Sequence, residues 1–125
     1  GSVTLPGGWR LRVELVGDLE SARAEASINA DPYRAWITFH QRGPAQFRVR
    51  ARRPGDRFFP MGLSNHKIKL SDFMINEKIP RRARAAWPLV CVGNEIAWLP
   101  GMRLAETFRL TGETKRAVHL RLSRE

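Results

Sequence analysis

Two segments of this chain alternate apolar and charged residues with a period of two, and this alternation restricts the fold more than any other feature. Residues 9–16 read WRLRVELV and residues 47–52 read FRVRAR. Successive side chains of a β-strand point to opposite faces of the sheet, so both segments are predicted to be strands with one buried face. The expected inward positions are Trp9, Leu11, Val13 and Leu15, followed by Phe47, Val49 and Ala51.

Further strands are expected on both sides of an irregular middle segment. Residues 34–40 read as a strand joined to 47–52 by a turn-like connection. After the middle segment, residues 88–93 and 95–101 predict a hairpin that turns at Gly93 and Asn94. Residues 106–110 and 117–122 are the candidates for the final strands.

The middle segment, residues 54–88, lacks a period of two and predicts two short helices. Ser71 is the expected N-cap of the first, which carries Asp72 in its first turn and ends at Lys78. Pro80 suits the first position of the second helix, which is expected to end at Trp87. The predicted buried positions are Leu70, Phe73 and Met74 in the first helix, and Ala83, Ala86 and Trp87 in the second. Of the adjacent Phe58 and Phe59, only one is expected to point inward, and Trp98 is expected in the core.

These elements predict an α+β fold, with antiparallel strands in sandwich-like sheets and a short helical pair inserted between them. A length of 125 residues suggests a single domain. Gly1 and Ser2 have the character of a cloning remnant, so the domain is expected to occupy residues 3–125. No apolar run is long enough to span a membrane, and a cytoplasmic location is expected.

The positive charge of the chain lies in its second part. The net charge is +10, yet residues 1–46 carry equal numbers of arginines and acids, so residues 47–125 hold the whole excess. A polyanion such as nucleic acid is the leading partner for such a surface, and solubility is the simpler alternative. The candidate phosphate-binding residues are Arg52, Arg53, Arg57, Lys67, Lys69, Lys78, Arg81, Arg82 and Arg84. Pro54 and Gly55 suit a type II turn, with Asp56 expected to bond nearby backbone or to pair with Arg57.

Five motifs follow one another in a recognisable order. They are RRPGDRFFPMG (52–62), KIKLSDF (67–73), KIPRRAR (78–84), WPLV (87–90) and EIAWLPGMRLAETFRLT (95–111). Together they resemble the C-terminal domain of tRNA(Ile)-lysidine synthases, over residues 47–111. Ile68 and Ser71 stand where that family often has lysine, and Ala85 follows Arg84 where aspartate is usual. A related fold is expected in the β chains of phenylalanyl-tRNA synthetases.

The resemblance implies a function for the domain and for its parent enzyme. The family uses ATP and Mg²⁺ to activate the wobble cytidine of tRNA(Ile) and joins it to lysine. The phosphate-binding SGGxDS-type loop for that chemistry is absent, so no catalytic centre, cofactor or metal is expected in this chain. The implied partners are tRNA(Ile), held near its acceptor stem, the catalytic and middle domains of the same protein, and a possible second copy.

Other functions remain open at this stage. The fold could instead serve as a docking module that packs on other domains or on a second copy, without RNA contact. A stand-alone hydrolase is disfavoured because no nucleophile–base pair is visible. His40, His66 and His119 share no metal-ligand spacing with one another or with Cys91, which is expected to be buried and inert.

Overall fold

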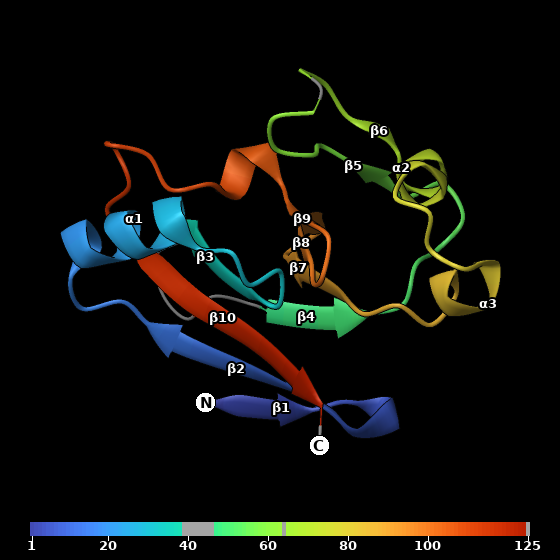
Figure 1. Cartoon of the computed structure of the whole chain (residues 1–125), viewed down its shortest axis with the longest axis horizontal. Helices are drawn as coiled ribbons and strands as arrows, with labels where there is room; N and C mark the ends of the chain where they lie inside the picture. The colour runs from blue at the N-terminus through green and yellow to red at the C-terminus, as the bar shows by residue number, and fades with distance from the viewer. Residues whose placement is uncertain (39–46, 64, 125) are drawn as a thin grey trace.

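The computed structural model describes residues 1–38, 47–63 and 65–124, and it contains two antiparallel sheets and a small ribbon (Figure 1). Sheet A has the strand order β1 (Ser2–Thr4), β2 (Trp9–Leu15), β10 (Ala117–Arg124) and β3 (Arg34–Thr38). Sheet B has the order β4 (Phe47–Arg50), β7 (Leu89–Val92), β8 (Glu95–Leu99) and β9 (Arg103–Leu104). The ribbon pairs β5 (Arg57–Phe58) with β6 (Ile68–Lys69). The helices are η1 (Pro6–Gly8), α1 (Leu19–Ile28), α2 (Leu70–Asn76), α3 (Arg81–Arg84) and η2 (Glu106–Phe108). The predicted α+β class with antiparallel sheets is confirmed.

One hydrophobic core joins both sheets and the inserted segment. Leu11, Ile37 and Leu120 from sheet A and Leu89 and Trp98 from sheet B are nearly inaccessible to solvent. From the inserted segment, Phe58 and Phe73 enter the same core and meet edge to face with their ring centroids 5.2 Å apart. The ribbon and α2 are therefore docked on the sheets through large apolar side chains, as the sequence predicts for Phe73 and for one of the two adjacent phenylalanines.

The alternating segments form β2 and β4, with two departures at their ends. Leu15, expected inside, is 80% exposed, because β1 pairs only with residues 10–12 and leaves the end of β2 without a neighbour on that side. Ala51 is exposed because β4 ends at Arg50, so the alternation no longer sets its direction. The predicted strand at 34–40 is β3 as far as Thr38, and its last two residues lie outside the described part.

The hairpin at residues 89–99 and the strand at 117–122 are confirmed as β7, β8 and β10. Gly93 has φ 61°, the left-handed conformation that a tight hairpin turn requires. The predicted strand at 106–110 is wrong, since η2 occupies Glu106–Phe108 and the strand that follows β8 is β9. The Phe108 N–H donates to the carbonyl of Ala105, so this segment turns instead of extending.

Helix α1, at residues 19–28, has no counterpart among the predicted elements. Its N-cap is Asp18, whose carboxylate accepts hydrogen bonds from the backbone N–H groups of Glu20 and Ser21 at 3.1 and 3.3 Å. Only Ala22 is buried in this helix, so it lacks the stripe of large apolar residues that identifies an amphipathic helix.

The inserted helical pair is present but shorter than predicted. The N-cap of α2 is Lys69, and Ser71 lies inside the helix. Leu70, Phe73 and Met74 are buried as expected. Helix α3 has four residues, and Ala86, predicted to be inside, is exposed because the helix ends before it.

Candidate nucleic-acid interface

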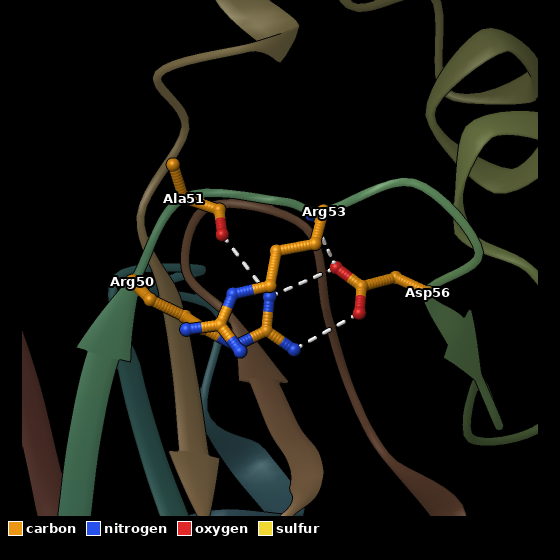
Figure 2. Close-up of polar contacts among 4 residues, drawn as sticks. All are labelled: Arg50, Ala51, Arg53 and Asp56. Carbon is orange, nitrogen blue, oxygen red and sulfur yellow. Dashed lines mark hydrogen bonds and ion pairs between the residues drawn. The ribbon is translucent and has the colours of Figure 1, made fainter.

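An ion pair between Arg50 and Asp56 holds the connection from β4 to β5 (Figure 2). Two guanidinium nitrogens of Arg50 donate to the two carboxylate oxygens of Asp56, each at 2.9 Å. The same carboxylate accepts the backbone N–H of Arg53 at 2.7 Å, and Arg50 also donates to the carbonyl of Ala51 at 3.0 Å. The carboxylate therefore accepts three hydrogen bonds, two from Arg50 and one from Arg53, and ties these residues to Asp56. The bond from the Arg53 N–H is the backbone contact that the sequence predicts as one alternative for Asp56. The ion-pair partner is Arg50, which the alternation predicts to face outward, and not Arg57.

This pair is partly buried, with 16% of the Arg50 side chain and 14% of the Asp56 side chain exposed. The hydrogen bonds from Arg50 lower the pKa of Asp56, helped by the Arg53 N–H and opposed by burial. The same interaction raises the pKa of Arg50. Both groups are charged in the folded domain at neutral pH, and the bidentate geometry is the strong form of such a pair.

The turn at Arg53–Asp56 closes with a hydrogen bond from the Asp56 N–H to the Arg53 carbonyl at 3.2 Å. Gly55, its third residue, has φ 86°, which is the positive value that a type II turn needs at that position. Asp56 also accepts, through its backbone carbonyl, a hydrogen bond from the N–H of Leu70 at the start of α2. The ion pair, the turn and α2 are thus one connected unit.

The ribbon places two cations opposite each other. Arg57 on β5 pairs in register with Lys69 on β6, and the Arg57 guanidinium donates to the carbonyl of Lys67 at 3.3 Å. Directly opposite side chains on neighbouring strands lie on the same face of the sheet. Like charges in that position destabilise the pair, and an anion bound between them removes the repulsion.

The connection between α2 and α3 positions the remaining cations. Lys78 has φ 59° and lies after the end of α2, while the N–H of the next residue, Ile79, donates to the Met74 carbonyl. Arg84 donates through Nε to the carbonyl of Ile79 at 2.9 Å and is half-buried. The sequence predicts that Arg84 faces outward, but it fastens α3 to this connection instead.

The other eight predicted phosphate-binding residues are exposed and lie on the ribbon, α3 and the adjoining loops, all in the same half of the molecule (Figure 1). We call them the motif surface: Arg52, Arg53, Arg57, Lys67, Lys69, Lys78, Arg81 and Arg82. Their backbone is held by the Arg50–Asp56 pair and by the buried side chains of α2. The motif surface is therefore a set of exposed cations on a backbone that the core holds in place, which suits the binding of an extended anion.

The other candidate residues do not assemble into a reactive site. Among the residues that the structure describes, no three histidine, cysteine or acidic side chains are placed to hold a metal. Cys91 is buried, and burial raises the pKa of its thiol, so it is an unreactive core residue at neutral pH. His66 is exposed, whereas His40 lies outside the described residues. No helix in the described ranges is long and apolar enough to cross a membrane.

Comparison with known proteins relates this architecture to one family. Residues 47–122 match the model of the TilS substrate C-terminal domain. The chain belongs to this family. A solved crystal structure of a TilS C-terminal domain has the same fold, with a TM-score of 0.73 and 25% identity over 99% of this chain and 90% of that one.

Full-length relatives extend the match in sequence. The tRNA(Ile)-lysidine synthase of Clostridium acetobutylicum is 44% identical over 77 residues, which is 62% of this chain and 16% of the relative. The enzyme of the same name from Clostridium tetani is 32% identical over 117 residues, 93% of this chain and 24% of the relative. The TilS C-terminal domain described here therefore corresponds to a quarter or less of the length of these relatives.

Proposed function

We propose that this domain binds tRNA through the motif surface, as the C-terminal domain of a tRNA(Ile)-lysidine synthase. The observation that carries the proposal is the placement of eight exposed cations on one docked unit, with Arg57 and Lys69 in direct cross-strand register. RNA helices are bound mainly through their phosphates and 2′-hydroxyls, and arginine and lysine side chains suit both. The name of the full-length relatives supports tRNA as the specific polyanion.

In the parent enzyme the domain holds the body of the tRNA near its acceptor stem. A separate catalytic domain uses ATP and Mg²⁺ to join lysine to the wobble cytidine. The role of this domain is then positional, because phosphate contacts set the register and orientation of an RNA without reading its sequence.

The test is a titration of the domain with whole tRNA at several salt concentrations. The variant Lys78→Gln/Arg81→Gln/Arg82→Gln removes three exposed cations and leaves Arg84 in place, because Arg84 fastens the helix connection. The slope of log affinity against log salt is expected to become shallower by roughly 0.7–0.9 for each phosphate that is no longer neutralised by a cation of the domain. A variant with unchanged affinity and unchanged salt slope would contradict the proposal.

A docking function has one observation of its own in favour. Leu63 and Ile75, in the inserted segment, are 52% and 53% exposed, and exposed apolar side chains mark a contact site for another protein where they form one contiguous patch. Docking through these residues would be insensitive to salt and would be abolished in Leu63→Ser/Ile75→Ser. The titration above separates the two functions, because binding through phosphates weakens steeply as salt is added.

A further inference from the structure

Three arginines from distant parts of the chain lie side by side on the outer face of sheet A. Arg12 on β2 pairs in register with Arg121 on β10, and Arg121 pairs in register with Arg34 on β3. Their neighbours Leu11, Leu120 and Ala35 point into the core, so the arginines point away from it. We call Arg12, Arg121 and Arg34 the arginine row.

The row concentrates positive charge, because its three members are all arginines. Like charges directly opposite one another on neighbouring strands repel, and here three occur in succession. Within the described part of the chain, the side chains of Arg12 and Arg121 have no hydrogen-bond or ion-pair partner. The nearest acids belong to the adjacent positions, since Glu14 pairs in register with His119, and Glu25 of α1 acts on the same histidine.

The end of the row at β3 is rigid. The Arg34 guanidinium lies 4.9 Å from the centre of the Trp36 ring and donates through Nε to Nε2 of His119 at 3.1 Å. Burial, followed by the charge of Arg34, lowers the pKa of His119, while Glu14 and Glu25 oppose this and Arg121 adds to it. His119 is therefore neutral at pH 7, which leaves its Nε2 free to accept the bond from Arg34.

We propose that the arginine row binds phosphate groups of RNA and forms a second contact face for the tRNA that the motif surface holds. The proposal rests on the proposed function and adds a site to it. Neighbouring strands are about 4.8 Å apart, so the row spans roughly 10 Å, a length that a few consecutive phosphates can cover. Arginine forks suit phosphate oxygens, and removal of the mutual repulsion adds to the gain on binding.

The surroundings of the row favour a phosphate backbone over a protein partner. On one side of the row, the outer-face positions are Thr4, Arg10 and Ser123, which are small or charged and pair in register with one another. On the other side, they are Glu14, His119 and Trp36. A protein interface needs a buried apolar or aromatic anchor, and the nearby Trp36 is only 5% exposed. Sheet A and the elements that carry the motif surface lie in different parts of the molecule, so the two faces are separate sites (Figure 1).

The test compares two variants of equal net charge. Arg12→Gln/Arg121→Gln removes two exposed members of the row and spares Arg34, which has structural contacts. Arg48→Gln/Lys115→Gln removes two exposed cations from β4 and from the loop before β10. Binding of whole tRNA is measured by fluorescence anisotropy between about 50 and 200 mM salt. The row variant is expected to bind more weakly than the control, with a salt slope shallower by roughly 1.4–1.8. Across that range its deficit in affinity relative to wild type should change by about tenfold.

Each outcome decides the proposal. If the row variant matches the control while the motif-surface variant is weakened, the row is not a tRNA site and the proposed function stands. If neither the row variant nor the motif-surface variant binds tRNA more weakly than wild type, both proposals fail. Poly-glutamate of matched charge serves as the probe for an acidic protein partner, and weakening of its binding in the row variant by the same factor would overturn the assignment to RNA. Circular dichroism melting establishes that the row variant is folded.

Discussion

Replacing Asp56 with asparagine tests whether the Arg50–Asp56 pair holds the motif surface. The substitution keeps the shape of the side chain, so it isolates the charge. It replaces one of the two acceptor oxygens with an NH2 group, removes the charge from the remaining hydrogen bond, and leaves Arg50, 16% exposed, without its counter-ion.

The magnitude follows from the burial of the pair. Breaking a fully buried pair costs about 3–5 kcal/mol and breaking an exposed one about 0–1 kcal/mol. With both side chains near 15% exposure, some water reaches the pair, and we expect the free energy of unfolding to fall by about 2–3 kcal/mol at pH 7. For a domain of this size the melting temperature should fall by about 10 °C.

The pH dependence gives an independent check. Because the folded-state pKa of Asp56 lies below its ordinary value, the unfolded chain takes up the proton first as the pH falls. The stabilisation is therefore complete above about pH 4 and is lost as the pH falls through the folded-state pKa. Asp56→Asn has no such group, so its stability should approach that of the wild type in acid.

The assay is urea denaturation followed by tryptophan fluorescence, at pH 7 and near pH 3. Glu95→Gln is the matched control, because Glu95 is exposed and its replacement should change stability by no more than about 0.5 kcal/mol. The reasoning is refuted if Asp56→Asn is as stable as Glu95→Gln at pH 7, or if its deficit persists unchanged in acid.

Three further predictions concern the fold that supports the two surfaces. Gly55→Val should destabilise the domain by about 1–3 kcal/mol, because a β-branched residue is strained at φ 86°; an unchanged melting temperature would contradict the turn assignment. Phe73→Ala should cost about 3–5 kcal/mol through the cavity left in the core, and limited proteolysis should then cut first in the inserted segment. Arg12→Gln/Arg121→Gln should raise the melting temperature at low salt, with the difference from wild type shrinking as salt screens the repulsion.

The sequence predicts best the elements whose burial pattern is simple. Residues 9–15 and 117–122 form strands as expected, because apolar side chains at alternate positions leave little choice of which face is buried, and the second of these strands continues to Arg124. Residues 89–92 also form the expected strand, and all four of their side chains are buried. Helix α1 escapes prediction because its one buried residue is Ala22, and an alanine adds no visible apolar stripe. The local signals of its start are the capping carboxylate of Asp18 and the acidic Glu20 in the first turn.

The sites show the limits of a local pattern more clearly. Alternation places Arg50 outward, yet Asp56 six residues later draws it into a partly buried pair. Arg84 is also predicted to face outward, but its Nε donates a hydrogen bond to the carbonyl of Ile79. The arginine row joins residues whose alignment depends on strand register between opposite ends of the chain, and no nearby sequence pattern specifies that register.

The position of β10 between β2 and β3 has a consequence for biosynthesis. The two strands that flank it are complete by Thr38, but the strand that joins them begins only at Ala117. The ribosome must therefore release most of the domain before sheet A can close, with contacts separated by roughly a hundred residues forming last. Until then β2 and β3 carry open edges, which other chains can pair with. The interval between synthesis of Thr38 and of Ala117 is thus when this domain has most need of a chaperone.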